Sequence, residues 1–170
     1  MPNLGEKVTG PIERCLGHEL GDVLYGCLTG ETDGTGLDDP ALYIGGEVHL
    51  HFNNATNIAI SWDENAGWKC HFSLVVAEAS VFNPGALRVW SAACLHPWSK
   101  VIGKPLLNAR VYGYDETPHI LRLSFDTNMS IFVGVGYQQK FGDGDDVLIR
   151  SSDNMIDLSD WDVLWSGSAA

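Results

Sequence analysis

The sequence predicts a strand-rich α+β fold in which two copies of one unit, a short helix followed by antiparallel strands, pack into a single domain. A length of 170 residues suits one domain, or two small ones that share a core. A hydrophobic content of 45% with 19% charged residues is typical of a globular chain. The 19 glycines, with aromatic and β-branched residues spread throughout, favour strands joined by tight turns.

The two-copy prediction comes from aligning the chain on itself. Pro11–Leu20 matches Pro97–Leu106 without gaps at an offset of 86, and Pro, Gly and Leu are identical. Val48–Asn53 then matches Leu121–Asp126 at an offset of 73. The difference of 13 residues falls in Gly26–Pro40, whose Gly, Asp and Thr content predicts a loop. Two blocks in the same order, with the length change in a loop, indicate an internal duplication.

Each copy is expected to begin with a short helix and continue as strands. Pro11 and Pro97 suit the first helical position, and Gly17 and Gly103 suit the left-handed residue after a helix. Alternating polarity and Asn/Asp turns then predict four strands in each copy. In the first copy the strands are Leu20–Cys27, Val48–Asn53, Asn57–Trp62 and Trp68–Val76. In the second copy they are Leu106–Tyr114, Leu121–Asp126, Met129–Gly136 and Asp146–Arg150.

The first repeat, which is acidic, therefore spans residues 11–76, and the second spans residues 97–150. One copy is too small to bury both faces of its sheet, so the copies are expected to form one continuous twisted sheet or two sheets face to face. Residues 77–96 are the linker, and their apolar stretch at 87–95 is ambiguous between strand and helix.

Residues 151–170 form an acidic, Trp-containing C-terminal segment without a counterpart in the first copy. Acidic and large apolar residues alternate in it, and Trp161 and Trp165 lie four residues apart. One interpretation is a last strand or short helix whose tryptophans pack on the core. The other is an aromatic anchor with an acidic rim, as found at the centre of protein interfaces.

The cysteines and the absence of targeting segments predict the compartment. Cys15, Cys27, Cys70 and Cys94 lie in apolar or strand-like segments without a CxxC pair, so we expect reduced, buried thiols and no structural zinc. The first residues lack the apolar core of a secretory signal, and no apolar run approaches the roughly 20 residues of a membrane span. The expectation is a cytoplasmic protein with no membrane contact.

The formal net charge of −12 is unevenly distributed. Residues 1–75 carry three basic and eleven acidic side chains, residues 76–150 carry seven of each, and residues 151–170 carry four aspartates and no basic residue. A field of one sign attracts basic partners and repels nucleic acid. We therefore expect a basic protein partner and no nucleic acid, although acidity that only maintains solubility would give the same total.

No motif nominates a catalytic site, so we expect neither an enzyme nor a cofactor. The chain has no Gly-rich phosphate loop and no GxSxG, and its Asp/Gly-rich segments at 33–39 and 142–146 lack the ligand spacing of a calcium loop. The carboxylate pairs at 63–64 and 115–116 fall in predicted turns, which does not indicate the facing pair of a glycosidase.

One pair of residues suggests a metal. His49 and His51 share one face of a predicted strand, and His71 is a candidate third ligand. The second copy carries Arg122 and Ser124 at the equivalent positions, which favours an ordinary solvated face.

The segments Trp98–Leu106 and Leu121–Asp126, with the small size and acidity of the chain, resemble immunity proteins of bacterial toxin systems. The resemblance implies tight one-to-one binding to a toxin domain, with the acidic face covering the active site of a basic toxin. Steering by the acidic field would then speed association by roughly 10- to 1,000-fold. The predicted partner-binding residues are acidic loop and tail positions with two aromatic anchors: Asp33, Asp38, Asp39, Asp63, Glu64, Asp160, Trp161, Asp162 and Trp165.

Two alternatives stay open. The first is a small-molecule- or metal-binding domain, an enzyme included, with its site between the two copies and with His49, His51 and His71 as the residues concerned. The second is a structural subunit that pairs through its sheet edges.

Overall fold

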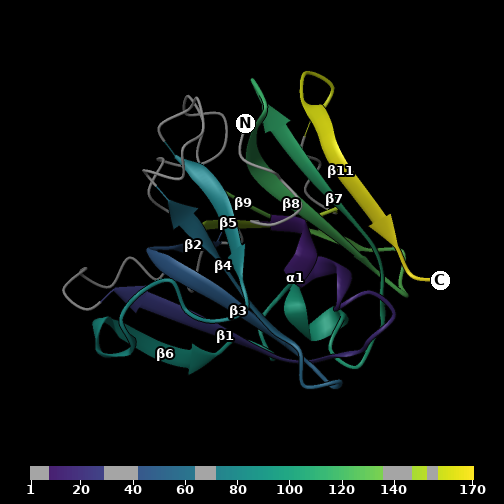
Figure 1. The fold of residues 1–170 in the computed structure, drawn as a ribbon. Helices are drawn as coiled ribbons and strands as arrows, with labels where there is room; N and C mark the ends of the chain where they lie inside the picture. The colour runs from purple at the N-terminus through teal and green to yellow at the C-terminus, as the bar shows by residue number, and fades with distance from the viewer. Residues whose placement is uncertain (1–7, 29–41, 64–71, 136–146, 153–156) are drawn as a thin grey trace.

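The computed structural model describes residues 8–28, 42–63, 72–135, 147–152 and 157–170 and contains two antiparallel sheets (Figure 1). The five-stranded sheet has the order β5-β4-β3-β1-β6, and we call it sheet 1. Its strands are β1 (Leu20–Leu28), β3 (Gly46–Phe52), β4 (Asn57–Asp63), β5 (Ser73–Ala77) and β6 (Leu87–Ser91). The six-stranded sheet has the order β11-β7-β8-β9-β10-β2, and we call it sheet 2. Its strands are β2 (Leu42–Ile44), β7 (Leu106–Tyr114), β8 (Thr117–Phe125), β9 (Ser130–Val135), β10 (Val147–Ser151) and β11 (Asp162–Ser168).

Helix is confined to short turns among the described residues. They are the four-residue α1 (Gly10–Glu13) and the 3-10 helices η2 (Pro84–Ala86) and η3 (Trp98–Lys100). None of the described helices is both long and apolar enough to cross a membrane. The strand-rich prediction is confirmed, and the helices contribute no layer of their own.

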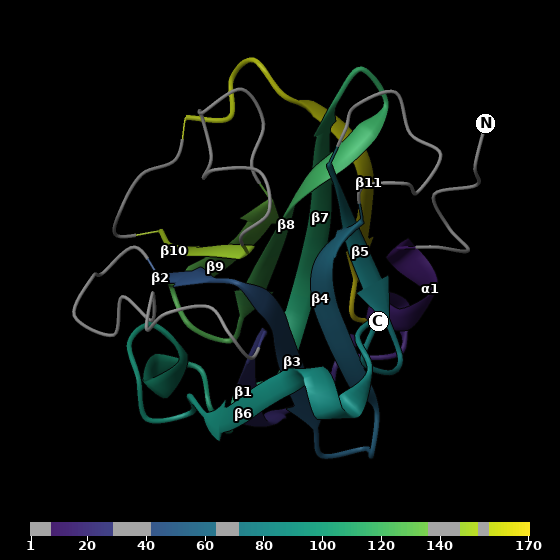
Figure 2. The same ribbon diagram turned by 90° about the vertical axis from the view of Figure 1, so that its left-hand side faces the viewer.

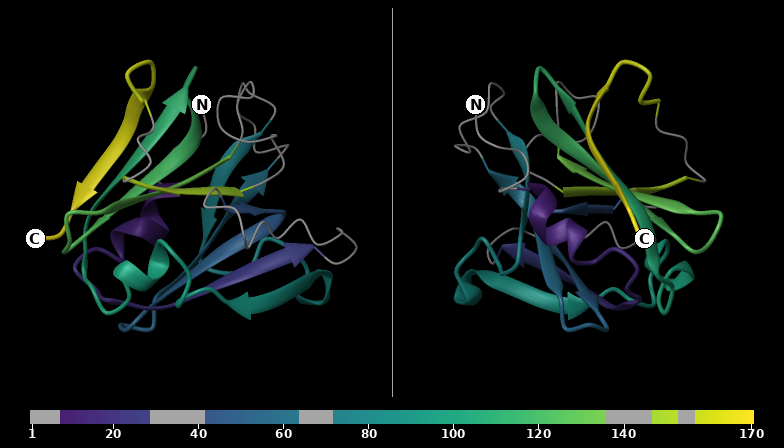
Figure 3. Two further views of the ribbon diagram at one scale, coloured as in Figure 1. Left: turned by 180° about the vertical axis from the view of Figure 1, so that it is seen from behind. Right: turned by 45° about the vertical axis from the view of Figure 1, so that its right-hand side comes forward.

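The core lies between the sheets, as in the face-to-face alternative. Side chains such as Val23, Leu50 and Ile60 of sheet 1 and Val111 and Val133 of sheet 2 belong to one buried cluster, which we call the main core. Figure 3 shows the sheets inclined to one another with α1 between them, and Figure 2 shows that α1 lies at one side of the molecule, near β5 and β11. In β3, for example, Val48, Leu50 and Phe52 point into this core and alternate with Glu47, His49 and His51, as strand geometry requires.

The two helix-to-strand connections bind each other reciprocally. The Gly17 N–H donates to the Leu106 carbonyl (2.8 Å), and the Gly103 N–H donates to the Leu20 carbonyl (2.7 Å). A second pair runs from Leu20 N–H to the Lys104 carbonyl and from Leu106 N–H to the His18 carbonyl. Gly17 and Gly103 have φ of 80° and 74°, the left-handed conformation predicted for them.

The two sheets also share one strand order. Reading from one edge, β5-β4-β3-β1-β6 in sheet 1 corresponds to β10-β9-β8-β7-β11 in sheet 2, with β2 added beyond β10. In sheet 1, β6 comes from the predicted linker and pairs with β1. In sheet 2, β11 comes from the C-terminal segment and pairs with β7 in the same way. β6 and β11 thus occupy the same place in the two strand orders.

Three local expectations need correction. β1 continues through Leu28 into the predicted loop, because its last residues pair with both β3 and β6. The short strand β2 was not predicted, since three residues carry almost no alternation. Cys94 is exposed, whereas Cys15 is fully buried and burial raises the pKa of its thiol to about 12. Cys70 lies outside the described residues.

Candidate functional site

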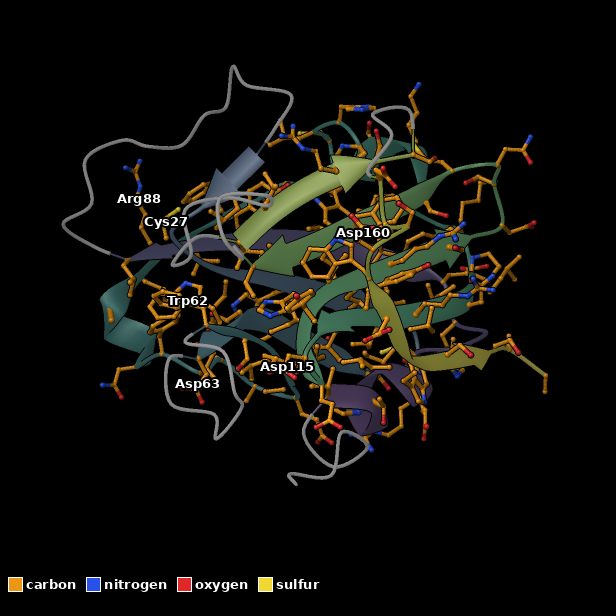
Figure 4. The ribbon with its side chains drawn as sticks, turned by 90° about the horizontal axis from the view of Figure 1, so that it is seen from above. Cys27, Trp62, Asp63, Arg88, Asp115 and Asp160 are labelled. Atoms are coloured by element: carbon orange, nitrogen blue, oxygen red, sulfur yellow. The ribbon has the colours of Figure 1, made fainter. Side chains whose placement is uncertain are left out.

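Acidic side chains gather where several strands end on one side of the molecule. We name this surface the acidic end and define it by the described residues Asp63, Asp115, Glu116, Asp160 and Asp162. Viewed from above, Asp63, Asp115 and Asp160 lie over this side (Figure 4). Asp63 is half-buried and the other four side chains are exposed.

The hairpin turn between β7 and β8 carries two of these carboxylates. Asp115 and Glu116 form its two-residue loop, flanked by the pair Tyr114 and Thr117. Their φ values of 49° and 65° are those of the mirror-image turn that matches the strand twist, in which Asn-Gly or Asp-Gly is the usual sequence. A glutamate at the second position accepts backbone strain and projects an exposed charge.

The start of β11 brings two more carboxylates to the same place. Asp162 pairs with Gly113 of β7, two residues before Asp115. Asp160 precedes the strand in a turn in which the Trp161 N–H donates to the Leu158 carbonyl (3.1 Å). The nearby Asp157 accepts hydrogen bonds from Ser159, which lower the pKa of its carboxyl. Strand pairing, rather than sequence proximity, therefore joins the tail to the β7–β8 turn.

Asp63 reaches the acidic end from the other sheet. It is the last residue of β4 and pairs with Ser73, the first residue of β5, whose hydroxyl donates to the Asp63 carbonyl (3.2 Å). β5 contacts β8, whose first residue follows the Asp115-Glu116 turn. The acidic end thus draws on both sheets.

The two tryptophans of the C-terminal segment pack on the protein, and they do so in different clusters. Trp161 lies edge-on against His119 (ring centroids 5.7 Å apart) and packs on the outer face of sheet 2 with Tyr112 and Phe132. Trp165 packs against the main core. Both side chains are half-buried, so each exposes only part of its ring. The tryptophans therefore pack on the protein, as the first interpretation of the C-terminal segment expected, and they do not form one continuous aromatic anchor.

The histidine pair lies on the outer face of sheet 1, with ring centroids 6.5 Å apart. His49 Nε2 is 2.7 Å from Glu47 Oε2, so this ring nitrogen faces a carboxylate of its own strand. Burial lowers the pKa of His51, as does the neighbouring His49, while Asp22 opposes them. Within the described part of the chain, no three His, Cys, Asp or Glu side chains are grouped to hold a metal ion.

Glu47 is a buried ionisable side chain, and no sequence pattern identified it. Its carboxylate is fully buried, and Oε1 accepts hydrogen bonds from Ser80 Oγ (3.0 Å), the Val81 N–H (2.6 Å) and the Phe82 N–H (3.0 Å). Burial alone would raise the pKa of Glu47, but the hydrogen bonds from His49, Ser80 and Phe82 outweigh it and lower the pKa. These contacts fix the segment after β5, which is an architectural task.

Several predicted site residues lie outside the described residues: Asp33, Asp38, Asp39, Glu64 and His71. The described members that the fold brings together are Asp63, Asp160 and Asp162, to which it adds Asp115 and Glu116. The sequence showed the last two as turn residues, but their closeness to the tail depends on the β7–β11 pairing.

Comparison with known proteins finds no matching family model, no matching curated protein and no matching solved structure.

Proposed function

We propose that this chain is an acidic binding protein that docks its acidic end on a basic protein partner, as an immunity or inhibitor protein does when it covers a toxin. The observation that carries the proposal is the gathering of Asp63, Asp115, Glu116, Asp160 and Asp162 from both sheets at one side of the molecule. These carboxylates lie in turns and at strand ends, and the four exposed ones can meet Lys and Arg side chains of a partner.

The surroundings of these carboxylates support protein recognition. Trp161, between Asp160 and Asp162 in the sequence, is partly exposed aromatic surface. Val163, next to Asp162, is 54% exposed, and Tyr114, next to the turn, is 46% exposed. An apolar and aromatic centre with a charged rim is the usual composition of a protein interface. The net charge of −12 would steer a basic partner to this surface.

The test is affinity purification of the tagged protein from its native cells, at low and moderate salt. One variant carries Asp160→Lys and Asp162→Lys at the acidic end. Its matched control carries Glu13→Lys and Asp126→Lys, which change the net charge equally at exposed positions away from that end. A basic protein should co-purify in near-equal amount with the native chain and the control, and be lost from the acidic-end variant. Equal retention by both variants would overturn the proposal.

We further propose that the two halves arose by internal duplication of a short-helix and antiparallel-strand unit. The shared strand order of the two sheets supports it, as do the left-handed glycines Gly17 and Gly103 at equivalent positions. The reciprocal hydrogen bonds through Leu20 and Leu106 are those expected of two copies related by a two-fold axis, since each bond has a partner with the roles exchanged.

A further inference from the structure

Three arginines and one phenylalanine form a row across the outer face of sheet 2. Strand register pairs Arg110 of β7 with Arg122 of β8, Arg122 with Phe132 of β9, and Phe132 with Arg150 of β10. We call these four residues the arginine row. They point away from the main core, because Val111, Leu121 and Ile149, their chain neighbours, belong to it. Three of the ten basic residues of the chain therefore share one line on one face.

Without a bound anion, this arrangement of arginines destabilises the sheet. Like charges directly opposite each other on neighbouring strands destabilise a sheet, and Arg110 faces Arg122 in this way. The described residues offer no compensation, since the ion pairs found among them are Arg14–Glu78 and His49–Glu47 only. On one side the row is bordered by the neutral side chains of Asn108, Ser124 and Ser130. On the other side it is bordered by Tyr112, Ile120 and Leu148, on which Trp161 packs.

Contacts with Ser130 and Phe132 orient the guanidinium group of Arg122. Its Nε donates to Ser130 Oγ (3.1 Å), and its guanidinium carbon lies 5.8 Å from the centre of the Phe132 ring. Ser130 is fixed in turn by Ser124 Oγ, 2.9 Å from its own hydroxyl oxygen. These contacts orient the guanidinium while its terminal N–H groups have no acceptor among the described residues. An oriented guanidinium binds a carboxylate or phosphate with two parallel hydrogen bonds.

We propose that the arginine row binds a short acidic segment of a partner protein. Neighbouring strands lie about 4.8 Å apart, so three strand spacings from Arg110 to Arg150 span roughly 14 Å. An extended peptide rises about 3.3 Å per residue, so four or five residues cover the row and present alternate carboxylates to it. Asn108, which is partly exposed beside the row, can supply hydrogen bonds to the backbone of such a segment.

A segment of this length fits better than other anions. A single small anion would engage one or two of the three arginines. A nucleic acid would need many more cations, and its backbone would extend toward Asp160 and Asp162, which lie at the β11 side of the same sheet. The arginine row adjoins the acidic end where Trp161 packs in one cluster with Phe132, and it takes ligands of the opposite charge.

The experiment is an NMR titration of the ¹⁵N-labelled full chain with hexaglutamate, at low salt. The expected result is saturable binding, with shift changes centred on the backbone amides of the arginine row. Arg110→Gln should weaken binding by roughly 10-fold, and Arg122→Gln by roughly 10- to 100-fold. Arg110 is exposed, so its substitution tests the site even if loss of the Arg122–Ser130 contact disturbs the sheet.

The matched control is Arg88→Gln, which removes one exposed arginine from β6 of the other sheet. It should bind hexaglutamate as the native chain does. The proposal is overturned if hexaglutamate does not bind, if Arg88→Gln weakens binding as much as Arg110→Gln, or if hexaglutamine competes equally. Tighter binding of a single-stranded DNA hexamer or of inorganic phosphate at the same amides would also overturn it, by assigning the row to a different anion.

Discussion

The buried carboxylate of Glu47 should be one of the largest single contributors to stability in this fold. Glu47→Ala removes the acceptor for Ser80 Oγ and for the Val81 and Phe82 N–H groups, and it removes the partner of His49. Breaking a buried, hydrogen-bonded charged contact by removing one partner typically costs about 3–5 kcal/mol. We expect a loss of that size for Glu47→Ala. Glu47→Gln keeps a neutral acceptor at Oε1, so its expected loss is about 1–2 kcal/mol.

Urea unfolding followed by tryptophan fluorescence measures this loss. With a slope of about 2 kcal/mol per molar urea, Glu47→Ala should lower the midpoint by roughly 2 M. Trp62 provides a local signal, because its ring lies edge-on to Phe82 at 5.9 Å. The control Asp126→Ala removes an exposed carboxylate and should stay within about 0.5 kcal/mol of the native chain. A Glu47→Ala variant as stable as that control would refute the reasoning.

The same carboxylate should make stability depend on acid. Burial opposes ionisation of Glu47, but its hydrogen bonds prevail and its pKa in the folded protein lies below the ordinary value of 4.5. The unfolded chain therefore takes up a proton first, so the contribution is complete above pH 4.5 and is lost as pH falls through the folded-state pKa. The difference in stability between the native chain and Glu47→Gln should be largest near neutral pH and shrink below pH 4.5. A pH-independent difference would show that the charge of Glu47 contributes nothing.

Three further predictions follow from single contacts. Glu116→Gly relieves a φ of 65° and should stabilise the protein by about 0.5–1 kcal/mol in urea unfolding; a loss of stability would show that the glutamate makes contacts worth more than the strain. Tyr25→Phe removes the acceptor of the buried Trp98 indole N–H (2.5 Å) and should lower the free energy of unfolding by about 1–3 kcal/mol. An unchanged free energy of unfolding would show that this hydrogen bond contributes nothing to stability. Burial lowers the pKa of His119 to about 4, so the stability that its neutral form gives the fold should be lost as pH falls from 6.5 toward 4. In His119→Gln the urea midpoint should change less with pH across this range. The same pH dependence in the variant and the native chain would contradict the role of His119.

Local patterns predicted most of the strands. β7 was predicted with the bounds it has, and β4 and β9 differ by a residue at their ends, because alternating polarity between Asn or Asp turns is a direct consequence of one buried face. For β6 the sequence did not decide between strand and helix, because Arg88 and Val89 are consecutive and both exposed, which interrupts the alternation of buried and exposed residues expected of a strand. Strands at the edge of a sheet carry a weaker pattern because they bury less of either face.

The candidate sites were less predictable, since they depend on register. The sequence marked Asp160 and Asp162 as acidic tail positions, but their closeness to Asp115 follows from β11 pairing with β7. Burial of Trp161 and Trp165 in different clusters also depends on where the segment crosses sheet 2. A pattern of residue types gives the face of a strand, whereas the neighbouring strand decides which side chains meet.

Register also changes what the charge count means. Residues 76–150 carry seven acidic and seven basic side chains, which predicts a neutral surface when they are only counted. In the fold their charges separate, because Asp115, Glu116 and Asp126 occupy turns at the ends of strands while Arg110 and Arg122 point outward from strand centres. Residues 76–150 therefore contribute Asp115 and Glu116 to the acidic end and three arginines to the arginine row, although their net charge is zero. Binding at the two surfaces should accordingly respond to separate substitutions, although both should weaken as salt is raised.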